Sequence, residues 1–414
     1  MADGKVMVQS TDGRIYTVTP EVGAVGNVAI TLPKEGGTLA NEAYVDTAIS
    51  ASADSILSII ASSTTGPYGV EWNSITDSYQ RVGATNVTQI QSQMKRCVLN
   101  NNGTVNYFLH PNDSTKKADG SASVIDGSAG NVMVQIPKFW YKHVYEYSIH
   151  KVSVSPIATS GYTVHPAFTR GGVEVDYRYY RAYEGYLDGT KLISRSGVAP
   201  TRNRTIVQYR ADALVNGAGW SQTDWNLLYA VQILFLTEFA TFDTQSILGN
   251  GNDTGSDYSI TTGQSNGIGN ASSSKNNDDM WMSYRGIENW YGNGWEFIDG
   301  INISEYVPFV NNMLPSTYVS DVFTGNYVTT GVTMPAASAS YTKNFHNSAK
   351  GFIPSVVGGS SATYTTDGLW TAAGSRVLAF GGAAAFGLLV GGFCLTAADG
   401  SANVSVAVGS GVSF

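Results

Sequence analysis

Four carboxylates, Glu71, Glu174, Glu184 and Asp188, are the residues from which a glycosidase pair would have to be drawn. Glycoside hydrolysis needs two carboxyl groups on opposite sides of the scissile bond. The spacing of these four in the sequence does not favour any pair. We therefore predict no catalytic residue and expect that the protein is not an enzyme.

Metal chemistry would need histidines or carboxylates at ligand spacing, and the chain does not show it. Two histidines four residues apart would suit a metal on a helix, but no such pair occurs among His110, His143, His150, His165 and His346. Asp253, Asp257, Asp278 and Asp279 could bind calcium, yet the D-x-D-x-D-G loop is absent. We predict no metal and no cofactor, with solvated loop carboxylates as the default.

The third group of candidates lies in residues 280–303, MWMSYRGIENWYGNGWEFIDGINI, where six aromatic residues fall within seventeen positions. Aromatic faces stack on sugars and make rigid contacts with proteins. Four of these residues are predicted to contact a receptor: Trp281, Tyr284, Trp290 and Tyr291. The alternative is that the stretch is the centre of an irregular core, since aromatic side chains also bury large areas.

The composition indicates what kind of fold must position these candidate residues. Only 14% of the 414 residues are charged, glycine occurs 46 times and tyrosine outnumbers phenylalanine, which indicates a loop-rich and mostly β composition. A net charge of −8 without a basic run disfavours nucleic acid. The sequence has no uninterrupted apolar run of ~18 residues, so we predict no membrane insertion. The start, MADGKVMVQS, lacks a signal peptide, so we expect synthesis in the host cytoplasm.

The first 67 residues differ from the rest. Residues 1–40 contain two short strands near 6–9 and 14–18, and are too short to bury a core alone. Residues 41–60 have an apolar stripe at helical spacing, rich in β-branched residues, which suits a three-stranded coiled coil. We predict an N-terminal attachment segment over 1–40 and a trimeric stalk and linker over 41–67. The alternative is one helix docked on its own domain.

From residue 68 to 414 the composition is globular. The patterns predict a helix within 82–97, another over 206–215, and a third that begins at Ser221. Ser221 can cap this third helix, which is apolar almost all round and should be buried. Residues 249–279 form a long polar loop, and small residues towards the end indicate buried strands.

Several stretches resemble a known family. Residues 26–46 resemble a segment common in tail fibres of tailed phages, and residues 130–142 and 183–200 resemble phage receptor-binding proteins with a C-type lectin-like domain. That superfamily includes targets of diversity-generating retroelements and formylglycine-generating enzymes. Three shorter stretches match motifs of this superfamily. Ser221 to Trp225 matches S/T-x-x-x-W, and Gly292 to Phe297 matches G-N-V-W-E-W. Arg376 to Gly382 matches R-V-L-x-G-G with one extra residue before the glycines.

The resemblance implies an α+β fold for residues 68–414, with two helices on an irregular antiparallel sheet. It places Trp295 and Phe297 in the scaffold. In retroelement targets the residues that match 383–395 form the exposed binding face, here Ala383, Ala384, Ala385, Phe386, Leu388, Leu389, Phe393 and Leu395. A glycine-packed sheet core is the alternative. Formylglycine-generating enzymes need a cysteine pair in this region, but only Cys394 lies there, so we expect buried free thiols at Cys394 and Cys97.

The function expected from the resemblance is that of an adhesin in a phage tail. It would recognise a bacterial cell-surface receptor, either polysaccharide or outer-membrane protein, without covalent chemistry. The N-terminus would bind other tail proteins of the virion, and the chain would form a homotrimer. A structural decoration of the virion and an envelope glycan hydrolase remain as alternatives.

Overall fold

The computed structural model describes residues 6–9, 15–18, 64–274, 280–346 and 350–414. Contacts divide the chain into two units, Met1–Thr65 and Gly66–Phe414. In the first unit, β1 (Val6–Gln9) and β2 (Ile15–Val18) pair antiparallel, which confirms the two predicted strands. The stalk expected at 41–67 lies outside the described residues as far as residue 63, so it and the trimer stay predictions.

The second unit is built mainly from β-sheet, and the α+β lectin-like expectation of two helices on one small sheet is wrong. The described residues of the whole chain form twenty-nine strands and three α-helices. The sheets curl into a half-barrel. The expectation gave too much weight to the two helical patterns, whereas many short runs of β-branched and aromatic residues form the framework.

A five-stranded sheet has the order β11-β9-β10-β3-β4, with every neighbour antiparallel. It is made of two hairpins that pair side by side through β3 and β10, with β11 added beside β9. Its strands are β3 (Tyr68–Asn73), β4 (Ser78–Gly83), β9 (Trp140–Glu146), β10 (Ile149–Ser155) and β11 (Thr163–Val164).

A seven-stranded sheet has the order β17-β29-β14-β8-β5-β6-β7. Its strands are β5 (Lys95–Leu99), β6 (Val105–His110), β7 (Asp113–Lys117), β8 (Asn131–Pro137), β14 (Tyr177–Arg181), β17 (Ser221–Gln222) and β29 (Val412–Ser413). The short strand β29 lies between β14 and β17, where Ser413 pairs with both Tyr180 and Ser221.

A nine-stranded sheet has the order β22-β21-β20-β26-β27-β25-β23-β24, and β28 adds parallel to β20. Its strands are β20 (Trp295–Ser304), β21 (Val307–Asn311), β22 (Tyr327–Thr329), β23 (Ala337–Phe345), β24 (Pro354–Val357), β25 (Gly368–Thr371), β26 (Ser375–Phe380), β27 (Leu395–Ala397) and β28 (Val408–Ser410).

Three separate hairpins are β12 (Thr169–Arg170) with β13 (Val173–Glu174), β15 (Gly185–Asp188) with β16 (Lys191–Ser194), and β18 (Ser283–Tyr284) with β19 (Ile287–Glu288).

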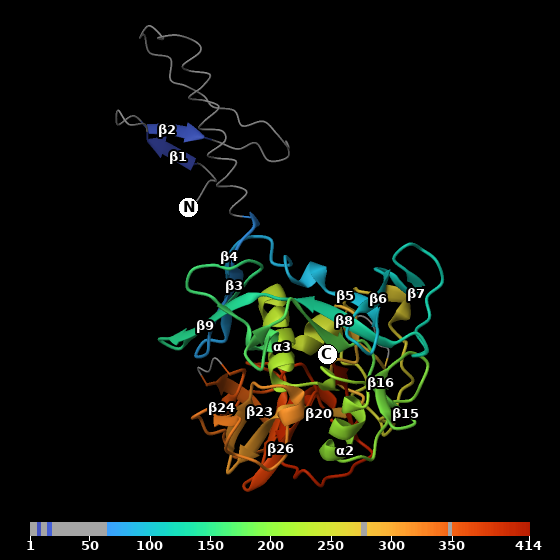
Figure 1. Ribbon diagram of the computed structural model, residues 1–414. Helices are drawn as coiled ribbons and strands as arrows, with labels where there is room; N and C mark the ends of the chain where they lie inside the picture. Colours follow the sequence, from blue (N-terminus) through green and yellow to red (C-terminus); the bar gives the residue numbers. More distant parts are fainter. Residues whose placement is uncertain (1–5, 10–14, 19–63, 275–279, 347–349) are drawn as a thin grey trace. The chain divides into compact units, whose positions relative to one another are not determined.

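Helix α3 (Trp225–Phe239) lies at the centre of this unit. In Figure 1, strands from the N-terminal half of the unit lie above this helix, and the orange-red strands from its C-terminal half lie below it. It is buried over almost its whole length, as its apolar sequence predicts. Asp224 rather than Ser221 caps it: the Asp224 carboxylate accepts the Leu227 N–H at 2.9 Å. Ser221 instead belongs to β17.

The other helical predictions have mixed outcomes. Helix α2 (Ile206–Leu214) confirms the helix predicted over 206–215, and Thr205 caps it. Helix α4 (Thr244–Leu248) is one short turn. The helix predicted within 82–97 is reduced to one turn of 3-10 helix, Gln91–Gln93, because β4 ends at Gly83 and β5 begins at Lys95, where it pairs with β8. No helix in the described part of the chain has the length and hydropathy that a membrane span needs.

Candidate functional site

Three of the four aromatic residues predicted to bind a receptor are buried, so that prediction is wrong for Tyr284, Trp290 and Tyr291. The Trp290 ring packs against Phe235 of α3, 5.8 Å between ring centroids, and against Phe380 of β26 at 5.9 Å. The Tyr291 hydroxyl donates to the Gly249 carbonyl at 2.6 Å. The physical reason is that α3 is apolar on all sides and needs partners; these rings supply one of its walls.

Trp295 and Phe297 are also buried, which confirms that this part of the stretch belongs to the scaffold. Between them, Glu296 forms an ion pair with Arg181, whose side chain is fully buried. Burial raises the pKa of Glu296 to about 6, although the charge of Arg181 opposes that shift. These carboxylate and guanidinium groups are enclosed, so they hold the fold together and present nothing to a ligand.

The C-terminal candidates divide in a similar way. Ala383, Ala384, Phe393 and Leu395 are buried, and as binding residues they are corrected to core. The adjoining glycines explain this, since a Cβ on Gly382 would lie 2.6 Å from Val390, and only a bare backbone fits.

The turn between the buried segments remains at the surface. Ala385 and Leu388 are exposed, while Phe386 and Leu389 are half-buried. Phe386 stands edge-on to Trp370 and Trp295, at 5.4 and 5.6 Å between ring centroids, so its ring serves the scaffold. The Leu388 side chain is the large apolar group that this turn offers to solvent.

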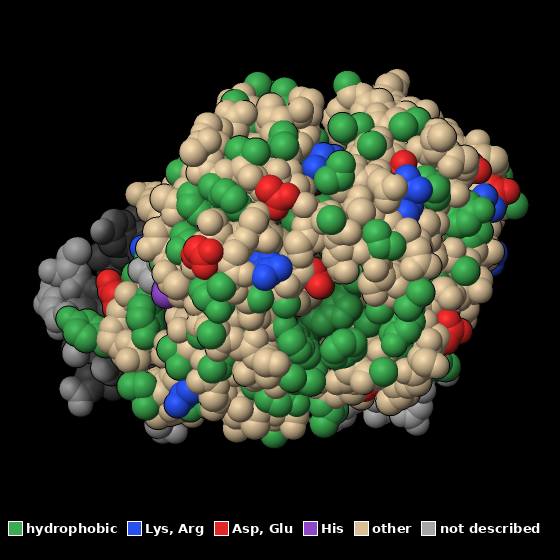
Figure 2. Space-filling model, turned by 90° about the horizontal axis from the view of Figure 1, so that it is seen from below, with side chains coloured by type: hydrophobic (Ala, Val, Ile, Leu, Met, Phe, Trp, Pro, Cys, Tyr) green, Lys and Arg blue, Asp and Glu red, His purple; other side chains and the backbone are tan. Residues whose placement is uncertain are grey.

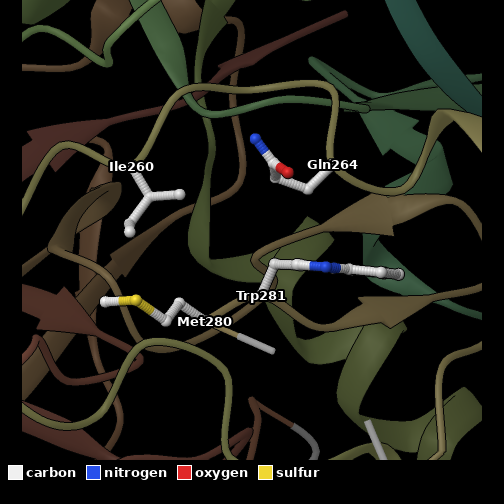
Figure 3. A pocket seen from close by; sticks show the side chains of 4 residues that line it. All are labelled: Ile260, Gln264, Met280 and Trp281. Atoms are coloured by element: carbon white, nitrogen blue, oxygen red, sulfur yellow. The ribbon is translucent and has the colours of Figure 1, made fainter. Parts of the chain in front are cut away.

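Trp281 is the aromatic candidate that the structure leaves accessible. It lies half-buried beside an open hollow of about 350 Å³ lined by Ile260, Gln264, Met280 and Trp281. Ile260 and Gln264 lie on one side of this hollow, and Met280 and Trp281 lie on the other (Figure 3). We call it the tryptophan hollow. The hollow combines an aromatic ring, two aliphatic side chains and an amide, and none of its lining residues is charged.

Sequence reasoning missed Ile260 and Gln264. Both come from the polar segment that follows α4, where a tight turn fixes them: Gln264 Nε2 donates to the Thr261 carbonyl at 2.9 Å. The Glu288 carboxylate anchors the same segment by accepting the Gly263 N–H at 2.7 Å. The signal in the sequence was weak, because Ile260 is one of two isoleucines, with Ile268, in this polar segment.

A second hollow of about 480 Å³ adjoins the same segment. It is lined by Ala199, Pro200, Arg202, Asn203, Ser256, Asp257, Tyr258, Ser259 and Val406. Arg202 supplies its one guanidinium, whose Nη2 donates to the Glu184 carboxylate at 2.6 Å and whose Nε donates to the Tyr258 carbonyl at 2.8 Å. The molecule is hollowed on the face seen from below, and hydrophobic side chains gather around that depression (Figure 2).

The residues that could do covalent or metal chemistry are not assembled. Glu184 is buried against Arg202, while Glu174 and Asp188 are exposed in other hairpins. Cys97 and Cys394 are both buried free thiols, as expected, and burial raises the pKa of each. Asp278 and Asp279 lie outside the described residues. Within the described ranges, no three His, Cys, Asp or Glu side chains come together as metal ligands.

The structure does bring two histidines together that the sequence spacing did not. His143 on β9 and His150 on β10 lie across the hairpin, with His143 Nε2 and His150 Nδ1 3.0 Å apart. The other nitrogen of His150 lies 2.9 Å from the Asn344 side-chain oxygen. Burial lowers the pKa of His143 to about 3 and that of His150 to about 4, so both rings are neutral near pH 7.

This pair predicts a loss of stability in acid. The unfolded chain binds protons at His143 below about pH 6.5, whereas the folded chain does so only near pH 3. Stability should therefore fall as pH drops through this window, by up to about 1.4 kcal/mol per pH unit for each proton excluded. Urea unfolding of wild type and His143→Gln between pH 7 and 4 should show a shallower loss in the variant. If the free energy of unfolding fell equally with pH in both proteins, the assignment of this loss to His143 would be contradicted. Buried carboxylates affect the pH dependence in the opposite direction, but they are present in both proteins, so their effect cancels in the comparison.

Neither a protein-family model nor a curated protein sequence matches this chain. What the surface can bind must therefore be argued from the hollow itself. Its geometry suits non-covalent binding: one tryptophan face, aliphatic side chains beside it and an amide opposite them.

Proposed function

We propose that the chain is a tail-fibre adhesin of a bacteriophage virion, which recognises a bacterial surface glycan without covalent chemistry. The tryptophan hollow carries this proposal. A sugar ring has an apolar face of C–H groups and a rim of hydroxyls. The indole of Trp281 suits the apolar face, and the Gln264 amide suits the hydroxyls, because an amide both donates and accepts hydrogen bonds.

The local geometry supports this assignment of roles. Gln264 donates through Nε2 to the Thr261 carbonyl, which leaves its side-chain oxygen free to accept a hydroxyl proton. Ile260 and Met280 add aliphatic surface around the ring. None of the four lining residues is charged, so a neutral segment of a polysaccharide fits better than a phosphorylated or acidic one.

The rest of the proposal concerns the virion. Residues 26–46 resemble a segment common in phage tail fibres, and we assign residues 1–40 to attachment on other tail proteins. A homotrimer formed through residues 41–67 would carry three hollows. Linking sites raises the effective concentration of the second and third binding events, so a weak single site becomes a firm attachment.

The test is a binding screen of the purified chain against envelope polysaccharides from a panel of bacteria. For a polysaccharide that binds, Trp281→Ala should weaken affinity about 2- to 12-fold, since a stacked aromatic ring contributes about 0.5–1.5 kcal/mol. Trp281→Phe should retain part of the affinity, and the unfolding midpoint should stay close to wild type. Leu388→Ala is the matched control, because it removes an exposed apolar side chain outside the hollow.

Each other result points elsewhere. If Leu388→Ala weakens binding and Trp281→Ala does not, recognition lies in the turn between residues 385 and 389. Release of reducing sugar during incubation would indicate a glycan hydrolase. Unchanged adsorption of virions that lack residues 66–414 would indicate a structural decoration.

A further inference from the structure

The second hollow adjoins the tryptophan hollow along the chain. Ser259 lines the second hollow and Ile260 lines the tryptophan hollow, and consecutive Cα atoms are only about 3.8 Å apart. We call the second one the aspartate hollow, because Asp257 supplies the carboxylate among its described lining residues. Residues 256–264 therefore form a ridge that borders the aspartate hollow over its first part and the tryptophan hollow over its second.

Buried amides hold the backbone of this ridge from the inside. Asn252 Nδ2 donates to the Asp257 carbonyl at 2.6 Å, and the Ile260 N–H donates to Asn293 Oδ1 at 3.2 Å. The two amides also bind each other, since Asn252 Nδ2 lies 3.0 Å from Asn293 Oδ1. Both asparagines are buried. A backbone held in this way is preorganised, which lowers the entropic cost of binding a ligand on its outer side.

The side chains around the aspartate hollow keep hydrogen-bonding groups available. Asp257 Oδ1 accepts the Ser259 N–H and hydroxyl, at 2.9 and 3.0 Å, whereas Asp257 Oδ2 has no hydrogen-bond donor among the described residues. In the same part of the chain, the side chains of Asn203, Ser256 and Tyr258 make no hydrogen bond either. One carboxylate oxygen, one amide and two hydroxyls are thus free to bind a ligand.

The charges of this hollow favour an uncharged ligand. Of its two charged lining residues, Arg202 pairs with Glu184, while Asp257 has no ion pair within the described ranges. The remaining nitrogen of Arg202, Nη1, is enclosed beside Gly409, where an added Cβ would lie 2.1 Å from it, and has no acceptor among the described residues. Val406, which is 56% exposed, adds aliphatic surface. Sugar hydroxyls can donate to a carboxylate, and a sugar C–H face can rest on aliphatic carbon.

We propose that the aspartate hollow is a second sugar subsite, which binds an uncharged unit of the same polysaccharide next to the unit held at Trp281. This rests on the proposed glycan-binding function and adds a specificity to it. The second unit donates hydroxyl protons to Asp257, and an acidic unit in its place would be repelled by that carboxylate. The shared ridge brings both subsites within reach of one ligand, and linked sites reinforce each other.

The first test compares Asp257→Ala with wild type on a polysaccharide that the wild-type chain binds. Affinity should fall about tenfold, the loss expected for a hydrogen bond to a charged group. Asp119→Ala is the matched control, because Asp119 Oδ1 accepts the Ser121 N–H and hydroxyl, at 2.9 and 2.6 Å, in the same kind of turn outside both hollows. It should leave affinity unchanged, and the unfolding midpoints of both variants should stay close to wild type.

The second test uses charge, with the same polysaccharide after oxidation of its primary hydroxyls to carboxylates. Wild type should bind the oxidised form more weakly than the native form. Asp257→Asn keeps an oxygen for the turn and removes the charge, so its ratio of oxidised to native affinity should be at least threefold higher than that of wild type. Asp119→Asn should keep the wild-type ratio. An equal ratio in all three proteins would overturn the contact between Asp257 and the sugar.

The failure of this inference differs from the failure of the proposed function. If Trp281→Ala weakened binding and Asp257→Ala did not, the second subsite would be refuted and the glycan proposal would stand. A loss at Asp257 without a loss at Trp281 would show that the two hollows do not share one ligand. An equal loss in Asp119→Ala would show that the effect does not belong to the hollow. If no polysaccharide bound the wild-type chain, the proposed function would be refuted and the subsite with it.

Discussion

Trp290→Ala is expected to destabilise the folded chain by about 3–5 kcal/mol, the cost of deleting a large aromatic side chain from a core. Trp290 is fully buried between α3 and β26, and its ring also contacts Tyr284 at 5.4 Å between centroids. Its removal opens a cavity whose walls belong to a central helix and a long sheet, neither of which can collapse freely. Urea unfolding followed by circular dichroism measures the loss.

Trp281→Ala is the matched comparison, because it deletes the same ring from the same stretch at a half-buried position. It should cost about 1 kcal/mol or less in unfolding free energy, yet weaken glycan binding. If Trp281→Ala proved the more destabilising of the two, the division of the aromatic stretch into core and binding surface would be wrong.

The second large effect is expected for Glu296→Ala, about 3–5 kcal/mol, because it leaves the buried charge of Arg181 without its carboxylate. Arg181 keeps its hydrogen bonds to the carbonyls of Glu288 and Asn289, at 2.8 and 2.7 Å, which do not neutralise it. The charge of Glu184 also acts on Arg181, but that carboxylate is already paired with Arg202. The free energy of unfolding at pH 7.5, well above the pKa of about 6 for Glu296, is the appropriate measure.

The double variant Arg181→Met with Glu296→Leu should recover much of this loss. An apolar pair of similar volume removes both desolvation costs, as replacements of buried ion pairs in other proteins have done. A double-mutant cycle should therefore give a strongly favourable coupling energy. Additive effects of the two substitutions would show that Arg181 and Glu296 do not depend on each other.

The local elements were accessible from sequence where one signal dominated. The apolar positions of residues 225–236 lie on every side of a helix, and that predicts burial whatever the partner is. The predicted capping residue lies three positions before the observed one, because Ser221 and Asp224 both suit a helix start. Tertiary pairing decided between them: Ser221 is taken up by β29.

The sheets were less accessible, because their pairings join residues far apart in the chain. Tyr180 pairs with Ser413, and no local pattern in either segment indicates this. The site shows the same limit. Trp281 could be proposed as a contact residue from its residue type. Trp290 has the same residue type and lies in the same aromatic stretch, yet it belongs to the core. Only packing against α3 distinguishes them, and only the fold of the polar segment brings Ile260 and Gln264 to face Trp281.

The position of β29 has a consequence for synthesis. Residues 412 and 413 fill the space between β14 and β17, so the seven-stranded sheet cannot close while a ribosome still holds them. Until then β14 has one unpaired edge, and unpaired edges invite association between nascent chains. Closing loops of more than two hundred residues is also slow. The second unit should therefore complete its fold only once residues 412 and 413 have left the ribosome, and the stage before that should be the one at which it is most prone to aggregate.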